Sequence, residues 1–279
     1  MIKKIIKLLK ASKNLIFPKK LKIVNQEIGN SNIKILEGTI PTKPDYDDAW
    51  FYELSKISNN LYDIGSNIGF ASIVANLNEN IKNIILVDPN PKALAIASKN
   101  LILNNLAYNC NFYLGFVGEK SDQKIKFYTL GTGAAGSMYK DHAYTASKFN
   151  KFFNVKTITI DDLFLIYKWV PDLVKIDVEA AEYLVLKGST NLAKLNKTRF
   201  LVEMHSVKEL SMNENAKLVL DWCFKNNYLA WYLKKECILK TPDQIAHRGR
   251  CHLLIQPKCW DYPQELKGIN QGQKVNYNY

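Results

Sequence analysis

The sequence predicts an α/β fold, with one mainly parallel sheet, helices on both faces and a β insertion around residues 121–160. Helical and strand patterns alternate from residue 46 to about 205, which is typical of βαβ units. Glycines and acidic side chains gather where the predicted strands end. The alternation breaks at residues 121–160, where KIKFYTL and VKTITI indicate two β segments around a long connection that contains glycine.

The first half of the predicted domain contains three helices and three strands. DDAWFYELSKI predicts a helix, LYDIG a short buried strand, and IGFASIVANL a second helix. NIILVD is the next strand. Asn90 and Pro91 then provide a cap and a first helical residue for the helix PKALAIASKNLILNN. NFYLGFVG is expected to be the third strand.

The second half continues the pattern after the insertion. A helix is expected to start at Asp161-Asp162, DLVKID is a buried strand, and EAAEYLVLK is a helix that ends at Gly188. FLVEMH, YLAWYL and CHLLIQ are further strands, with a helix around ENAKLVLDWCFK. No linker interrupts residues 46–258, so we predict one domain there, preceded by a basic arm (1–45) and followed by a polar tail (259–279).

The positive charge of the chain is concentrated in the arm. The chain carries 38 Lys and Arg against 26 Asp and Glu, a net charge of +12. Residues 1–26 contain eight Lys and no acid, which leaves a net of +4 for the rest. A chain-wide nucleic-acid surface is therefore disfavoured, and no nucleic-acid partner is expected.

The arm itself is amphipathic. Placed on a helical wheel, residues 1–20 put isoleucines on one side and most lysines on the other, a pattern that suits an anionic membrane surface. The alternative is a helix packed on its own domain. Lysines break the apolar run and no small-residue cleavage site follows it, so we expect a cytoplasmic protein with peripheral contact at the inner membrane surface.

The five cysteines, at 110, 223, 237, 251 and 259, include no C-x-x-C pair. A disulfide framework or a zinc site is not expected, which fits a reducing cytoplasm.

The ends of the predicted strands indicate a nucleoside site. Ligands of open parallel sheets bind beyond the carboxyl ends of the strands. Gly65 allows a sharp turn and close approach to a ligand, and Gly69 allows close packing of the next helix. Asp88, at the end of the next strand, can accept hydrogen bonds from both ribose hydroxyls. The alternative is that Asp63 caps a helix and Asp88 begins a turn.

The phosphate fingerprint G-x-G-x-x-G is absent from this position, so adenosine with another substituent is favoured over a pyrophosphate. S-adenosylmethionine fits, with Asp63 facing its ammonium group, the loop of Ser66 and Asn67 its carboxylate, and Asp88 its ribose. Phe116 and Val117, at the end of the third strand, are assigned to the same site. The literal match at residues 131–136, GTGAAG, lacks a following helix and is interpreted as a flexible loop or plain hairpin connection.

Several motifs together resemble the FkbM family of S-adenosylmethionine-dependent methyltransferases. They are LYDIGSNIGFAS, ILVDPNP, NLILN, TITIDDL, DLVKIDVEAAEYLVLKG and FLVEMH, which cover residues 61–205 in family order. The resemblance implies a Rossmann-like class I methyltransferase fold, S-adenosylmethionine as cofactor, and O-methylation of a sugar, glycan or related small molecule. Two positions depart from the family pattern. Ala180 replaces its usual Gly, which puts the substrate geometry beside Asp177 in question, and Asp88 replaces its usual Glu.

An O-methyltransferase holds the acceptor in line with the methyl group, and a general base takes the proton of the hydroxyl. His205 is our first candidate for this base, because an unperturbed imidazole is mostly neutral at cytoplasmic pH. Asp177 and Glu179 are the alternatives, either as base or as hydroxyl acceptors, and Glu179 can also serve only its helix. A metal bridging Asp177 and Glu203 was weighed, but no metal ligand is assigned. His142, His247 and His252 are interpreted as structural.

Two other functions remain open at this stage. The same core can methylate RNA or protein, although no RNA-binding module precedes it. A membrane-associated binding protein with a degenerate cofactor site would have no affinity for S-adenosylmethionine. The oligomeric state and the acceptor are not predicted.

Overall fold

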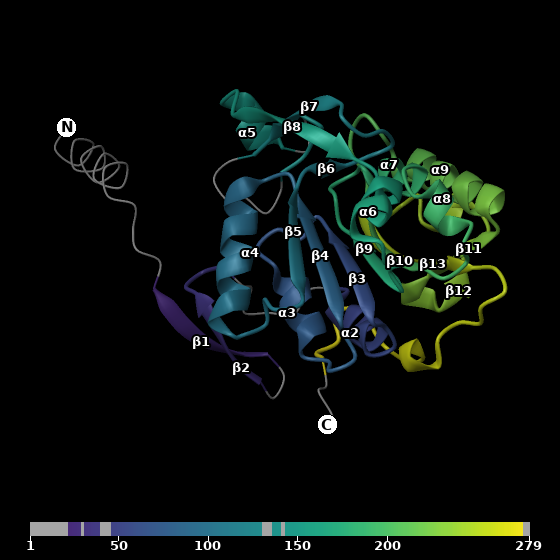
Figure 1. Cartoon of the computed structure of the whole chain (residues 1–279). Helices are drawn as coiled ribbons and strands as arrows, with labels where there is room; N and C mark the ends of the chain where they lie inside the picture. Colours follow the sequence, from purple (N-terminus) through teal and green to yellow (C-terminus); the bar gives the residue numbers. More distant parts are fainter. Residues whose placement is uncertain (1–21, 29–30, 40–45, 130–135, 141–142, 276–279) are drawn as a thin grey trace.

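The computed structural model describes residues 22–28, 31–39, 46–129, 136–140 and 143–275. Its largest sheet has eight strands in the order β12-β11-β13-β10-β9-β3-β4-β5 (Figure 1). The strands are β3 (Asn60–Ile64), β4 (Asn83–Asp88), β5 (Cys110–Leu114), β9 (Leu173–Ile176), β10 (Arg199–His205), β11 (Tyr228–Tyr232), β12 (Cys237–Ile238) and β13 (Arg250–Pro257). The predicted α/β class is confirmed.

The central strands β5, β4, β3, β9 and β10 pair in parallel, while β13 runs antiparallel to both β10 and β11. Strand order reverses between β3 and β9, since β4 and β5 lie on one side of β3 and the later strands on the other. A crevice therefore opens at the carboxyl ends of β3 and β9. Because β13 is antiparallel, its first residues reach this same end of the sheet.

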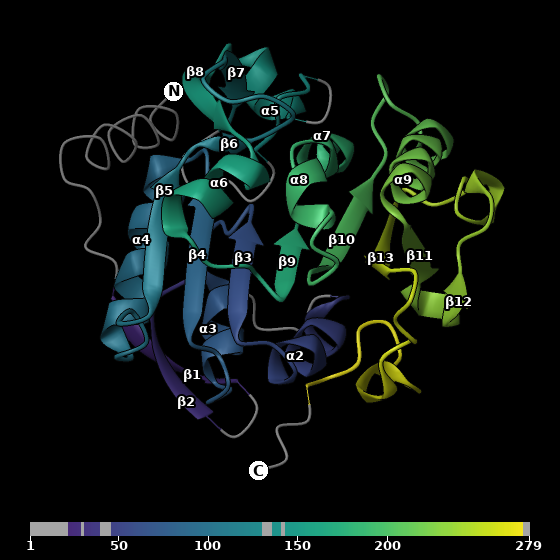
Figure 2. The same cartoon turned by 45° about the vertical axis from the view of Figure 1, so that its right-hand side comes forward.

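Helices cover both faces (Figure 2). One core cluster joins β3, β9 and β10 to α2 (Asp48–Lys56), α3 (Phe70–Asn76) and α4 (Pro91–Leu103). The other joins the opposite face to α6 (Ile160–Tyr167), α7 (Glu182–Lys187), α8 (Thr190–Ala193) and α9 (Met212–Asn226). Capping side chains fix the first residues of three helices. The Asn90 side chain accepts a hydrogen bond from Lys92 N at the start of α4, and the Thr159 side chain accepts one from Asp162 N at the start of α6. Ser211 forms a capping box with Glu214 at the start of α9.

The strand registers place the polar residues of the sheet on one face. Asp63 is paired with Lys175, Lys175 with Leu201, and Glu203 with His252. Since residues two apart in a strand share a face, Asp63, Lys175, Glu203 and His252 all point to the side that α2 covers.

The β insertion lies over the carboxyl ends of the main sheet in both views (Figures 1 and 2). It contains β7 (Lys124–Tyr128), α5 (Tyr144–Lys148) and β8 (Phe152–Ile158), and β7 and β8 pair antiparallel. The predicted third strand is two strands: β5 ends at Leu114, and after Gly115 the short β6 (Phe116–Val117) pairs with β8 instead. The chain changes sheets at this glycine.

The core extends beyond the predicted limits of 46 and 258. A hairpin of β1 (Ile23–Ile28) and β2 (Ser31–Leu36) lies beside α4, where Asn104 and Asn100 accept hydrogen bonds from Lys34 N and Leu36 N. Ile33 and Ile35 are buried in the same cluster as α2. Residues 22–28 and 31–39 therefore pack as part of the domain, because their alternating isoleucines have an apolar face to bury.

The C-terminal segment also packs on the domain. Leu266, in the 3₁₀ turn η3 (Gln264–Leu266), is fully buried, and Ile269 accepts a hydrogen bond from Trp50 Nε1. The remaining 3₁₀ turns are η1 (Leu233–Lys235) and η2 (Pro242–Gln244). Among the described residues, no helix is both long enough and apolar enough to span a bilayer. The predicted amphipathic helix of residues 1–20 lies outside the described residues.

Candidate functional site

A pocket opens where β3, β4 and β9 end, and it encloses about 600 Å³ of open space. Five residues that the sequence predicts to bind S-adenosylmethionine line this pocket: Gly65, Asn67, Asp88, Phe116 and Val117. Their binding of this cofactor stays a prediction. The other lining residues are Ile64, Val87, Pro89, Asn90, Ala93, Gly115, Phe127, Gly136, Asp177, Val178 and Glu179. Eight of the sixteen lining residues have apolar side chains and five have polar or charged ones, a mixture that can hold an apolar ring and bind polar groups. Of the GTGAAG loop, residues 131–135 lie outside the described residues.

Gly65 and Gly69 shape the loop after β3, and both have a φ of +81°. A Cβ on Gly65 would lie 1.8 Å from the backbone oxygen of Asp177, and one on Gly69 would lie 2.8 Å from Ala97 Cβ in α4. Gly69 therefore allows close helix packing, as expected. The close approach of Gly65 in this structure is to the backbone at the end of β9.

Asp88 is buried at the wall of this pocket. Its Oδ2 accepts a hydrogen bond from Asn67 N at 2.8 Å, and its Oδ1 accepts one from Asn90 N at 2.7 Å. Burial raises the pKa of Asp88 to about 6, although these two N–H groups oppose the rise. The carboxylate thus holds both neighbouring loops in place, and each oxygen keeps a further lone pair for a ligand.

Asp63 and Ser66 border a second cavity and not the first pocket. Asp63 is buried and accepts a hydrogen bond from Ser72 Oγ at 2.7 Å. Burial raises the pKa of Asp63, while Lys175 and Ser72 work against the increase. Ser66 Oγ is buried and has no hydrogen-bond partner among the described residues.

The second cavity encloses about 1260 Å³ of open space and meets the first pocket along Gly65, Asn67, Asp177 and Glu179. Its charged lining consists of Asp47, Asp48, Asp63, Asp177, Glu179 and Glu203 with Lys175 and Arg250. Carboxylates therefore dominate this cavity.

Lys175 is the buried cation at the centre of this lining. Its Nζ lies 3.3 Å from Asp177 Oδ2 and 3.7 Å from Asp47 Oδ2. Burial alone would lower the pKa of Lys175, but Asp177, Asp47 and Asp63 raise it well above its ordinary value. Lys175 is thus a fixed positive charge at neutral pH.

Asp177 stands at the junction of the two cavities. Burial raises its pKa to about 7, and the repulsion by Glu203 adds to this effect, whereas Lys175 lowers it. At neutral pH this carboxyl group exchanges its proton easily, which suits acid–base chemistry.

His205 differs from the sequence-based expectation. Its Nδ1 lies 3.0 Å from Glu182 Oε1, and its Nε2 lies 3.4 Å from Glu203 Oε1 and 3.6 Å from Glu179 Oε2. Burial would lower the pKa of His205, but its contacts with Glu182 and Glu203 raise it to about 11. A raised pKa favours the protonated imidazole at neutral pH, which disfavours His205 as a general base, and its catalytic role stays a prediction.

The backbone at Glu179 and Ala180 is left-handed, with φ values of +53° and +79°. Helix α7 consequently begins at Glu182, three residues after the predicted start. Glu182 is buried, and its Oε1 accepts a hydrogen bond from Ala180 N at 2.9 Å. The family's usual Gly at the position of Ala180 fits this backbone better than Ala does.

Several charged residues of the site were not identified from the sequence: Asp47, Lys175, Glu182, Arg250 and His252. Arg250 Nη1 lies 2.7 Å from Glu203 Oε1, and His252 Nε2 lies 3.5 Å from Glu203 Oε2. Burial would raise the pKa of Glu203, but its contacts with His205 and His252 hold it well below its usual range. Lys175 does have a sequence signal, since it is the one charged side chain in the apolar strand β9.

Two groups of side chains have the ligand types and spacing of a metal site among the described residues. They are Asp47, Glu203 and His252, and Asp177, Glu203 and His205. In the second group, both imidazole nitrogens of His205 have carboxylate partners outside the group, Glu182 for Nδ1 and Glu179 for Nε2.

A family model described as the methyltransferase FkbM domain matches residues 63–229. A search of curated proteins finds no match. Among solved structures, the chain is similar to a methyltransferase FkbM from Methylobacillus flagellatus KT, at 15% identity and a TM-score of 0.45 over 71% of this chain and 43% of that one. It thus spans less than half of that protein.

Two other similar structures are TYW2 proteins. M. jannaschii TYW2 in complex with AdoMet has 14% identity and a TM-score of 0.43, over 86% of each chain. P. horikoshii TYW2 in complex with MeSAdo has 10% identity and a TM-score of 0.46, over 84% of this chain and 69% of that one.

Proposed function

We propose that the chain, which belongs to the FkbM methyltransferase family, uses S-adenosylmethionine to methylate a hydroxyl group of a sugar, glycan or related small molecule. The observation that carries this proposal is the position of Asp177. It lines both cavities, and its pKa of about 7 suits removal of a proton from a hydroxyl group.

The residues of the first pocket fit the adenosine part of the cofactor. Phe116, Val117 and Val178 offer apolar surface to a base, and Asp88 offers lone pairs to the ribose hydroxyls. Asp63 and the loop of Ser66 and Asn67 then face the amino-acid part, beside the second cavity. This placement puts the reactive end of the cofactor near Asp177.

The cofactor supplies a methyl group that its sulfonium makes electrophilic. The protein holds the acceptor hydroxyl in line and near Asp177, which takes its proton. Lys175 contacts Asp177 and keeps the carboxylate oriented. His205, as a cation held by Glu182, positions Glu179 and Glu203 around the second cavity.

The charge of the second cavity bears on the choice of acceptor. A lining dominated by carboxylates repels the phosphates of RNA and offers hydrogen-bond acceptors to a polyhydroxyl compound. This supports a neutral or cationic acceptor. Cytoplasmic location and peripheral membrane contact through residues 1–20 remain part of the proposal, on the sequence pattern alone.

Calorimetry with S-adenosylmethionine and S-adenosylhomocysteine tests the cofactor site. We expect Asp88→Ala to weaken binding by ~10- to 100-fold, since two hydrogen bonds to a charged group are lost. Asp88→Glu, which restores the residue usual in the family, should retain most of the affinity. Equal affinities for all three proteins would place the ribose elsewhere.

The acceptor class is tested with methyl-labelled cofactor and separate pools of glycans, small sugars, RNA and protein. Label should appear on a glycan or sugar in an alkali-stable ether. Label found mainly in RNA would overturn the proposed acceptor. Loss of labelling in Asp177→Asn, with unchanged cofactor affinity, is expected for the base.

A further inference from the structure

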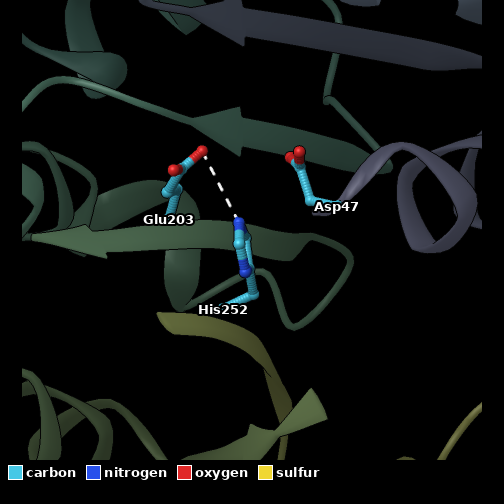
Figure 3. A group of neighbouring side chains, drawn as sticks. All are labelled: Asp47, Glu203 and His252. Atoms are coloured by element: carbon cyan, nitrogen blue, oxygen red, sulfur yellow. Dashed lines mark ion pairs between the residues drawn. The ribbon is translucent and has the colours of Figure 1, made fainter. Parts of the chain in front are cut away.

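A cluster of three buried polar side chains, each from a separate element, lies beside the second cavity. Asp47 precedes α2, Glu203 lies on β10 and His252 on β13, and Figure 3 shows their side chains turned toward one another. Their relative exposures are 4%, 3% and 2%. One ligand atom from each lies within 4.8 Å of the other two. The antiparallel pairing of Glu203 with His252 fixes two of the three side chains on a rigid sheet.

Two of these groups have unmet hydrogen-bonding capacity. Among the described residues, Asp47 Oδ2 and His252 Nε2 are buried without a hydrogen-bond partner. The ammonium of Lys175 is 3.7 Å from Asp47 Oδ2, and His252 Nε2 is 3.5 Å from Glu203 Oε2 at the outer limit for a hydrogen bond. A buried carboxylate oxygen and a buried ring nitrogen without hydrogen bonds lower the free energy of unfolding. A bound ligand would offset this cost.

Acidic side chains outnumber basic ones around this cluster. The second cavity is lined by six Asp and Glu side chains and by two basic side chains, Lys175 and Arg250. Asp47 and Glu203 are two of the six. The surroundings are therefore rich in oxygen ligands for a cation.

We propose that Asp47, Glu203 and His252 bind a divalent transition-metal ion. Two carboxylate oxygens and one imidazole nitrogen form a mixed donor set that suits Mn²⁺, Fe²⁺ or Zn²⁺ better than Ca²⁺ or Mg²⁺. Ligands about 2.1 Å from one ion lie roughly 3.0–3.4 Å apart. The observed separations therefore need only small side-chain rotations, and Lys175 keeps its shorter contact with Asp177.

The location of this site gives the ion a role in binding the acceptor. This part of the inference rests on the proposed function. Asp47 and Glu203 line the second cavity, so the remaining coordination positions of the ion face the space proposed for the acceptor. Two neighbouring hydroxyl oxygens of a sugar can bind there and orient the reacting hydroxyl toward Asp177.

Metal binding is measured on the full chain after removal of metals by a chelator and dialysis, without cofactor or acceptor. Titration with Mn²⁺ alone, followed by electron paramagnetic resonance, should show one bound ion per chain. The pulsed spectrum should carry a nitrogen hyperfine signal from a directly coordinated imidazole. This signal needs no variant, so it remains decisive if variants fold poorly.

Asp47→Asn and His252→Gln should each weaken Mn²⁺ binding by roughly 10-fold or more, and His252→Gln should remove the nitrogen signal. His247→Gln, which changes an exposed histidine, is the matched control and should bind as the parent does. Absence of saturable binding, or binding without the nitrogen signal, would overturn the site. Calorimetry with S-adenosylmethionine on the same samples reports on the proposed function separately.

Discussion

Replacing Asp177 by Asn tests the charge state on which the proposed base depends. Asn has nearly the shape of a protonated Asp, so the variant mimics the low-pH form of the site at every pH. Lys175 keeps Asp47, Asp63 and Glu203 as neighbouring charges after the change. Any difference in stability that varies with pH then reports mainly on the ionisation of Asp177.

The direction of the pH dependence follows from the pKa of Asp177, which is higher in the folded protein than in the unfolded chain. The unfolded chain ionises Asp177 near the ordinary value of 3.8, and the folded protein near about 7. The stability that protonated Asp177 contributes to the parent protein is therefore fully present below pH 3.8 and is lost as the pH rises through 7. The full shift corresponds to about 4 kcal/mol. Because 30% of the side chain is exposed, solvent screening should reduce this to about 2 kcal/mol.

Urea unfolding at pH 5, 6, 7 and 8, with a chelator present, measures this difference. We expect Asp177→Asn to unfold with a free energy about 1 kcal/mol above that of the parent at pH 5 and about 2 kcal/mol above it at pH 8, because the unfolded chain already ionises Asp177 above pH 3.8. Asp122→Asn, which changes an exposed carboxylate paired with Lys156, should show no such divergence.

Two results would refute the reasoning. One is a stability difference that stays constant between pH 5 and pH 8, which would mean that Asp177 ionises normally in the folded protein. The other is a stability advantage that shrinks with rising pH. In activity assays the parent kcat/KM should rise with pH through an apparent pKa near 7, and Asp177→Asn should lose this limb together with most of its activity.

Three further substitutions test other parts of the site. His205→Gln removes the cation beside the buried carboxylate of Glu182 and should lower the free energy of unfolding at pH 7 by about 3–5 kcal/mol in urea; a loss below ~1 kcal/mol would contradict the ion pair. Gly65→Ala places a Cβ 1.8 Å from a backbone oxygen at a φ of +81°, so calorimetry should show lost cofactor binding, and unchanged affinity would contradict this geometry. Ala180→Gly relieves about 1–2 kcal/mol of strain from the left-handed backbone at this position. The lost burial of the methyl group and the added backbone entropy of the unfolded chain roughly offset this gain, so the free energy of unfolding should stay within ~0.5 kcal/mol of the parent value. Ala181→Gly, at a negative φ, gains no such relief and should cost about 1.5 kcal/mol in the same urea assay.

The fold and the residues that line the first pocket were predictable because they depend on local patterns. Buried parallel strands read as short apolar runs, and helices between them have their own periodicity and caps. The residues that follow such strands must meet at one end of the sheet. Asp88, Phe116 and Val117 therefore line one pocket although they are spread over 30 residues of sequence.

The charge state of His205 was not predictable, since it depends on Glu182, 23 residues away and on a helix of the opposite layer. His252 was missed for a similar reason: only the antiparallel pairing of β13 with β10 brings it to Glu203. The strands of residues 23–28 and 31–36 had a usable signal, two alternating segments around Gly29-Asn30, but the eight lysines of residues 3–22 favoured the arm interpretation for the whole of residues 1–45.

The reversed direction of β13 brings side chains from beyond the region shared with the family to the edge of the site. Every residue that lines the first pocket lies within 63–229, whereas Arg250 and His252 enter from a strand beyond residue 229. On the proposed function, substitutions in that strand would alter the second cavity and leave the lining of the first pocket unchanged. A fragment that stops at residue 229 would keep the residues of the first pocket and would lose Arg250, the cation paired with Glu203.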